Sequence, residues 1–156
     1  MKTSRVLTAL VSMTILIATI GCSKDKDNPT GPDVVSSIPA GLVATWNYQS
    51  VTINGIPNSL PDVLDFDPGT IAARLTINSN GSFVYEETDS SGVVAWMERG
   101  TIAVSGNEFT STTTSDSDGP VNPPFVEQGT YVLSLNRLEI ETVPFASDVY
   151  EFVLTR

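Results

Sequence analysis

Histidine is absent from this chain, and cysteine occurs only once. Without histidine the chain cannot form a Ser-His-Asp triad, a Cys-His nucleophile pair or a zinc site built on histidine. A single cysteine has no partner for a disulfide within the chain. Because these absences remove much hydrolase and metal chemistry, we expect a protein that is not an enzyme and that holds no metal or other cofactor.

Basic residues are scarce as well. The 156 residues contain 8 Lys and Arg against 18 Asp and Glu, which gives a formal net charge of −10. Nucleic-acid binding and electrostatic docking on anionic lipid both need clustered positive charge, so we expect no nucleic-acid partner. The hydrophobic fraction of 40% is enough to fill the core of one domain.

The one long apolar run lies near the N-terminus. Lys2 and Arg5 come first, and residues 6–20 follow as VLTALVSMTILIATI. This run is shorter than the roughly 20 residues of a membrane-spanning helix. A basic start, an apolar segment and small residues at its end are typical of a secretory signal peptide.

The segment Thr19-Ile20-Gly21-Cys22 resembles the lipobox of bacterial lipoproteins. The resemblance implies cleavage before Cys22, so that residues 1–21 are a lipoprotein signal peptide. It also implies that Cys22 carries a thioether-linked diacylglycerol and an amide-linked acyl chain such as palmitate, which together would anchor the protein stably to a membrane. The alternatives are a plain secretory signal with an incidental cysteine and a retained signal anchor.

Residues 22–37 follow as a predicted flexible tether. Its first part, SKDKDNPTGPD after the cysteine, has no apolar side chain apart from its prolines. Ser23 after the cysteine is similar to the pattern of lipoproteins sorted to the Gram-negative outer membrane. The run of residues 24–27, KDKD, is similar to tethers of surface-exposed lipoproteins. We therefore expect a cell-envelope protein, lipid-anchored to the outer membrane on its periplasmic side or at the cell surface.

Residues 38–156 are predicted to form an all-β domain. Runs rich in Val, Ile, Thr, Tyr and Phe alternate with short Gly, Asn, Ser and Asp clusters, which is typical of antiparallel strands. We expect strands over 43–53, 71–77, 82–88, 93–98, 100–105, 108–115, 128–135 and 138–143, with a ninth candidate over 149–154. The two pieces on either side of Gly100 could be one bent strand.

The turns support this reading. Asn80-Gly81 lies between two alternating runs, and Asn-Gly accepts the positive φ angles of a type I′ hairpin turn. Further tight turns are expected at 105–107 and 135–137. Two proline-containing segments, 54–70 and 116–125, are predicted to be long loops, either binding loops or inert surface loops.

The order of these pieces resembles bacterial lipocalin-like lipoprotein domains. The matching segments are LVATWNYQSVTINGIP, ARLTINSNGSFVYEE, GTIAVSGNEFT and GTYVLSLNRLEIET with YEFVLTR at the end. The resemblance implies an antiparallel up-and-down barrel of about eight strands; a β-sandwich is the alternative. It also implies a barrel-closing pair in which Arg156 of the last strand covers Trp46 of the first.

Side-chain alternation predicts which residues face the barrel interior. The predicted inward residues are Trp46, Tyr48, Leu75, Ile77, Phe83, Tyr85, Ile102, Val104, Tyr131, Leu133, Leu135, Leu138, Ile140, Phe152 and Leu154. They could form a solid core, in which case the protein would be a structural or interaction lipoprotein that acts through its loops. They could instead surround a cavity for a small hydrophobic or amphipathic ligand, bound by Trp46, Tyr48, Phe83, Tyr85, Tyr131 and Phe152.

The acidic residues give weaker signals. Glu86, Glu87 and Glu98 could supply a glycosidase pair, but strand glutamates usually face solvent and nothing in the sequence fixes their separation. The segment 116–119, DSDG, has part of a calcium-loop pattern. In that register, residues 114 and 125 would be Thr and Phe, where carboxylate ligands are required. We therefore expect a solvated turn there, and a weak calcium site at Asp62, Asp65 and Asp67 is the alternative.

Overall fold

A computed structural model describes residues 37–63, 69–143 and 148–156. The predicted signal peptide, Cys22 and all but the last residue of the predicted tether lie outside these ranges. So do Asp65 and Asp67 of the proposed calcium site.

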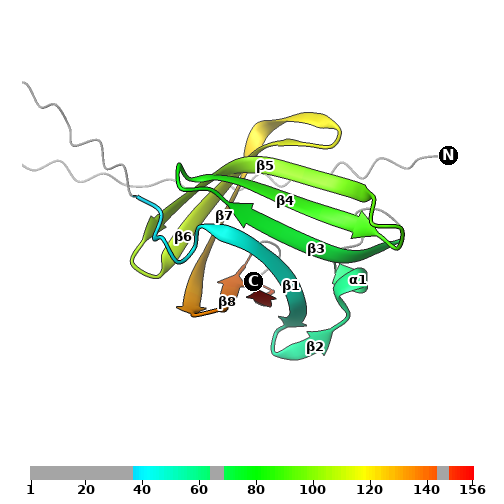
Figure 1. Ribbon diagram of the computed structural model, residues 1–156, viewed down its shortest axis with the longest axis horizontal. Helices are drawn as coiled ribbons and strands as arrows, with labels where there is room; N and C mark the ends of the chain where they lie inside the picture. Colours follow the sequence, from blue (N-terminus) through cyan, green and yellow to red (C-terminus); the bar gives the residue numbers. More distant parts are fainter. Residues whose placement is uncertain (1–36, 64–68, 144–147) are drawn as a thin grey trace, which may run out of the picture. The chain divides into compact units, whose positions relative to one another are not determined.

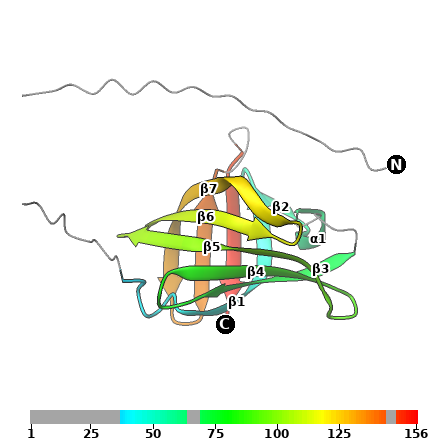
Figure 2. The same ribbon diagram turned by 90° about the horizontal axis from the view of Figure 1, so that it is seen from above.

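The described residues form a closed antiparallel barrel of eight strands with one additional short strand, β2. Consecutive barrel strands pair in sequence order, and the first pairs with the last through a ladder that runs from Asn47↔Thr155 to Ile53↔Tyr150 (Figures 1 and 2). The strands are β1 (Ala44–Ile53), β2 (Ile56–Asn58), β3 (Thr70–Ile77), β4 (Ser82–Asp89), β5 (Val94–Ser105), β6 (Glu108–Asp116), β7 (Gly119–Ser134), β8 (Arg137–Thr142) and β9 (Tyr150–Thr155). The prediction of an all-β up-and-down barrel is confirmed, and the sandwich alternative is wrong.

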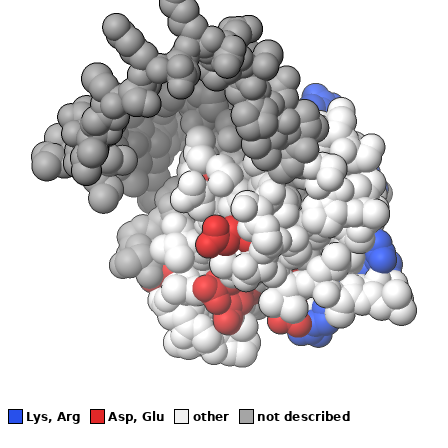
Figure 3. Space-filling model, turned by 90° about the vertical axis from the view of Figure 1, so that its left-hand side faces the viewer, with Lys and Arg blue, Asp and Glu red and all other residues white. Residues whose placement is uncertain are grey.

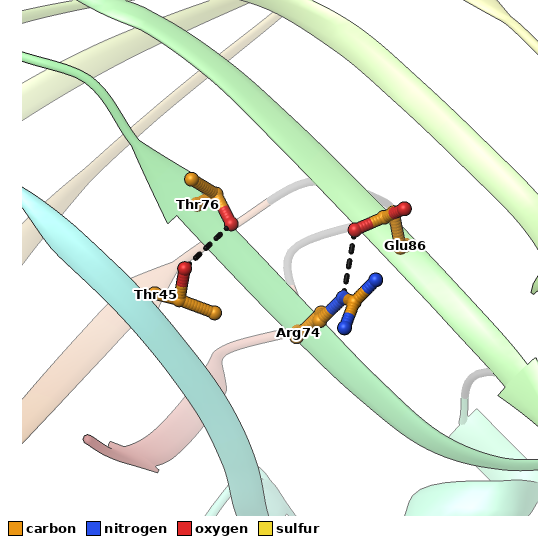
Figure 4. A network of polar contacts seen from close by, with 4 residues as sticks. All are labelled: Thr45, Arg74, Thr76 and Glu86. Carbon is orange, nitrogen blue, oxygen red and sulfur yellow. Dashed lines mark hydrogen bonds and ion pairs between the residues drawn. The ribbon is translucent and has the colours of Figure 1, made fainter. Parts of the chain in front are cut away.

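The sequence pattern accounts for the filled interior, because apolar and polar side chains alternate along most of the barrel strands. Fourteen of the predicted inward residues pack in the core or line the interior. On the outer face, polar side chains pair across neighbouring strands (Figure 4). Thr45 and Thr76 share a hydrogen bond of 3.0 Å, and Arg74 pairs with Glu86 at 2.7 Å.

Leu135 is the one inward prediction that is wrong. It lies in the turn between β7 and β8 and is 81% exposed. The strand ends one residue earlier, at Ser134, which pairs with Arg137. The alternation rule therefore stops applying before it reaches Leu135.

Two Asn-Gly pairs lie in turns, and Asn80-Gly81 does not form the turn type that the sequence predicts. Gly81 has a φ of 82°, whereas Asn80 does not have a positive φ, and the Gly81 amide donates to the Asn78 carbonyl at 3.0 Å. This is a three-residue loop and not the predicted type I′ turn. Asn54 and Gly55, with φ angles of 52° and 75°, form the two-residue turn between β1 and β2.

Of the two predicted long loops, one contains short secondary structure and the other is part of the sheet. In the segment 54–70, the described residues contain β2 and the short helix α1 (Leu60–Val63). The segment 116–125 is not a loop, because Ser117 and Asp118 form a tight turn and β7 begins at Gly119. Its prolines suggested a break in the sheet, yet strand pairing continues on both sides of a register shift between Thr113 and Ser115.

The two predicted strands around Gly100 form one strand, β5, with a register shift between Arg99 and Gly100. Glycine is required here because a Cβ atom would collide with the Thr112 carbonyl of β6.

Within the described ranges, no helix is long and apolar enough to cross a membrane.

Candidate ligand cavity

One end of the barrel is filled by packed side chains, and we call it the Trp46 end. Trp46 is fully buried among Ile38, Leu42, Leu138 and Leu154. Its indole Nε1 donates a hydrogen bond of 3.0 Å to the Leu42 carbonyl, so the polar atom of this large side chain is satisfied. This end is therefore solid and leaves no room for a ligand.

Arg156 covers Trp46, as the family resemblance implied for a barrel-closing pair. The guanidinium carbon lies 5.0 Å from the centroid of the indole ring, which is within range of a cation–π contact. The same guanidinium donates to the Leu135 carbonyl at 2.6 and 3.2 Å and to the Gly41 carbonyl at 3.1 Å. The side chain thus joins the N-terminal segment, the β7–β8 turn and the end of β9.

Beyond Leu42 the interior holds a cavity of about 270 Å³. It is bounded at the other end of the barrel, which we call the α1 end, by Val63, Phe125 and Tyr150. Five of the six residues predicted to bind a ligand line it: Tyr48, Phe83, Tyr85, Tyr131 and Phe152. Trp46 does not, because it lies in the solid end.

Two aromatic rings of the cavity wall rest on glycines of neighbouring strands. A Cβ atom at Gly100 would lie 2.9 Å from the Phe83 ring, and one at Gly129 would lie 2.8 Å from the Phe109 ring. Larger residues at these glycines would push both rings into the cavity. The size of the cavity therefore depends on the presence of glycine at positions 100 and 129.

Tyr48 and Tyr85 form an aromatic cluster with Phe152. Tyr48 makes edge-to-face contacts with Tyr85, at 5.8 Å between ring centroids, and with Phe152, at 5.4 Å. Burial is the main cause that raises the pKa of both phenols far above its ordinary value. Both hydroxyls therefore remain protonated and can act as hydrogen-bond donors.

Glu87 of β4 is a buried carboxylate that alternation places beside Tyr85 on the inner face. Its exposure is 0%, contrary to the expectation that strand glutamates face solvent. The Tyr85 hydroxyl donates to Glu87 Oε1 at 2.6 Å, and Thr70 Oγ1 donates to Oε2 at 3.1 Å. Since both oxygens are held by neighbouring side chains, this carboxylate fixes the Tyr85 ring and ties β3 to β4.

Glu98 and Glu127 line the cavity itself. Glu98 accepts hydrogen bonds from Trp96 Nε1 at 3.2 Å and from Thr113 Oγ1 at 3.4 Å. Glu127 accepts one from Thr142 Oγ1 at 2.7 Å. Burial, and to a smaller extent the charge of Glu98, raises the pKa of Glu127.

The sequence prediction missed Glu127, although a signal for it existed. Alternation backward from the inward Tyr131 passes through Gly129 to Glu127 and then Phe125, and all four lie on the inner face of β7. The predicted strand began only at residue 128, and residues 116–125 before it were predicted to be a loop. Glu98 could have been placed in the same way from Ile102.

The acidic turn at the end of β6 has a structural role. Asp116 Oδ1 accepts hydrogen bonds from the amides of Asp118 at 2.8 Å and Gly119 at 3.1 Å, which closes the β6–β7 turn. In the part of the chain that the structure covers, no three His, Cys, Asp or Glu side chains are placed to share a metal ion.

No family model matches the chain, and no curated protein matches it. Among solved structures, the chain is similar to a de novo designed fluorescence-activating β-barrel. The two sequences are 17% identical, with a TM-score of 0.37 over 80% of this chain and 97% of the designed one. The closed barrel of the present chain is defined by its own strand pairing, above all the ladder between β1 and β9.

Proposed function

We propose that this protein is a lipid-anchored lipoprotein of the bacterial cell envelope whose barrel binds a small hydrophobic or amphipathic ligand without catalysing a reaction. The observation that carries the proposal is the cavity of about 270 Å³ in the barrel interior. Small-molecule sites are concave, mostly apolar and roughly 300–1,000 Å³ in volume. The cavity lies just below the lower end of that range, so the ligand is a small one.

The lining suits such a ligand. Apolar contact would come from Phe83, Phe109 and Phe152, and directional contact from the hydroxyl of Tyr48. The Tyr131 hydroxyl instead donates to the Gly106 carbonyl in the exposed β5–β6 turn, at 2.9 Å. Because the Trp46 end is filled, the ligand would lie in the half of the barrel toward α1.

Native mass spectrometry of the protein extracted from its own membrane tests ligand binding. We expect a bound mass beyond that of the acyl chains on Cys22. Ile140 lines the cavity, and Ile140→Phe should remove this mass by filling the space. Val132 is 63% exposed on the outer face, and Val132→Phe is the matched control that should retain the mass. Absence of any bound mass, with only the protein and its acyl chains detected, would contradict the proposal.

The anchor has a separate test. The proposal places two or more acyl chains on Cys22, where each buried methylene contributes roughly 0.8 kcal/mol to membrane binding. Cys22→Ala should leave the signal peptide uncleaved by the lipoprotein pathway and the protein unlabelled by a fatty-acid probe. Normal labelling of this variant would refute the anchor at this position.

A second candidate is a structural or interaction lipoprotein that acts through its surface. It is favoured by apolar side chains exposed near the β7–β8 turn, where Leu135 is 81% and Val132 is 63% exposed. Leu135→Ser would disrupt a partner contact there without changing the cavity. A bound small molecule that survives this substitution would favour the ligand-binding function.

A further inference from the structure

The charges around the cavity are all of one sign. Glu98 and Glu127 line it, whereas no Lys, Arg or His does among the described residues. Every basic side chain of the described ranges lies outside the cavity: Arg74, Arg99, Arg137 and Arg156. On the face shown in Figure 3, acidic and basic groups are few and most of the described surface is uncharged.

Ionised carboxylates in a mostly apolar interior are costly unless a positive charge or several donors compensate them. The donors found here are neutral: Trp96 and Thr113 contact Glu98, and Thr142 contacts Glu127. A carboxylate can accept about four hydrogen bonds on its two oxygens. Both groups can therefore accept a further, charged donor.

The two carboxylates are on strands that flank β6. Ser111 of β6 pairs with Glu127, and Thr113 of the same strand donates to Glu98. Neighbouring strands are about 4.8 Å apart, so β5 and β7 lie about 10 Å apart on either side of β6, and both glutamates line the same cavity from there. The charge of Glu98 raises the pKa of Glu127, which agrees with this proximity.

The rest of the lining suits the apolar part of an amphipathic molecule. Ile102, Phe109 and Ile140 provide apolar contact, and Tyr48 and Tyr85 add aromatic rings. Aromatic faces attract cations, most strongly where water is excluded. A cation with an apolar body could bind the two carboxylates with its charge and the apolar side chains with its body.

We propose that the ligand is a small amphipathic cation, an alkyl or aryl amine whose ammonium group binds Glu98 and Glu127 while its apolar body packs against Ile102, Phe109 and Ile140. This inference rests on the proposed ligand-binding function and adds the charge of the ligand to it. An alkylammonium group has a pKa near that of lysine, about 10.4, so the amine is charged at neutral pH.

The test compares three probes with the same alkyl chain and different head groups: octylamine, octanol and octanoate. Isothermal titration calorimetry of the purified protein at neutral pH gives the three dissociation constants. We expect octylamine to bind at least about tenfold more tightly than octanol, because hydrogen bonds between charged groups are stronger than neutral ones. Octanoate should bind most weakly, since its charge is repelled by both glutamates.

A double variant, Glu98→Gln with Glu127→Gln, should lower the affinity for octylamine about tenfold or more and leave octanol binding unchanged. The matched control is Glu108→Gln with Glu141→Gln, which changes the net charge equally at two exposed positions outside the cavity. The control should leave the affinity for all three probes unchanged.

The outcomes separate this inference from the proposed function. If octanol and octylamine bind equally well, or if octanoate is preferred, the inference is overturned while ligand binding stands. If none of the three probes binds, both fail. The comparison of probes on the unmodified protein decides the question even if the double variant does not fold.

Discussion

Replacement of Arg156 by alanine would show how strongly this side chain holds the Trp46 end of the barrel. The substitution removes the cation–π contact with Trp46 and three hydrogen bonds to the carbonyls of Leu135 and Gly41. Arg156 is exposed, so water can replace part of these interactions. The cation–π contact contributes about 0.5–2 kcal/mol, and exposed hydrogen bonds lie at the low end of about 0.5–1.5 kcal/mol each.

We therefore expect Arg156→Ala to lower the free energy of unfolding by about 1–3 kcal/mol, or to lower the melting midpoint by about 4–12 °C. Urea unfolding followed by tryptophan fluorescence measures this change. Arg156→Lys should have an intermediate effect, because lysine keeps the charge but lacks the planar group that reaches two carbonyls at once.

Arg137→Ala is the matched control for this prediction. Arg137 pairs with Glu139 at 2.8 Å, and their side chains are 52% and 49% exposed. Such exposed pairs contribute about 0–1 kcal/mol. If Arg156→Ala destabilises the protein no more than Arg137→Ala, the argument that Arg156 closes the barrel is wrong.

Three further predictions concern pH and packing. Burial raises the pKa of Glu127, so the folded protein binds more protons than the unfolded chain from about pH 4.5 upward to that raised value, and stability falls as the pH rises through this window. Glu127→Gln should therefore have a higher free energy of unfolding than the parent protein at neutral pH and an equal one below this pH window. Urea unfolding at several pH values measures both. A difference between the two proteins that does not change with pH would contradict this prediction. Gly129→Ala should destabilise the barrel by about 2 kcal/mol or more, because a Cβ atom there meets the Glu141 carbonyl and the Phe109 ring, and an unchanged calorimetric midpoint would be the contrary result. Hydrogen bonds from Ser91 and Val93 lower the pKa of Asp89, so its stabilising effect is present above the unfolded pKa and is lost as the pH falls through the folded value. Asp89→Asn should accordingly make the free energy of unfolding change less with pH in the acid range. If that pH dependence is the same in the variant and the parent protein, this prediction is wrong.

Much of the barrel could be predicted because period-two alternation specifies which face a strand side chain occupies. Fourteen of the fifteen inward assignments agree with the structure, and the exception, Leu135, is one residue past the end of its strand. The errors lie where local signals compete. Prolines at 120, 123 and 124 suggested a loop, yet β7 passes through them and pairs with β6.

The cavity was less predictable, because alternation gives the face of a residue but not its height along the barrel axis. Trp46 and Tyr48 are both inward on β1, but Trp46 fills the solid end while Tyr48 lines the cavity. Their difference depends on Leu42 just before β1 and on Leu138 and Leu154, which come from distant parts of the chain.

The sequence by itself determined the strand pattern, most of the inward face and the restriction on chemistry that comes from the lack of histidine. Its N-terminal pattern also predicts the lipid anchor, which stays a prediction. Only the tertiary structure decided that one end of the barrel is solid, that the other holds a cavity, and that Glu98 and Glu127 line that cavity together. The physical reason is that burial and electrostatic environment depend on neighbours from several strands, and closure between β1 and β9 brings those neighbours together across about a hundred residues of chain.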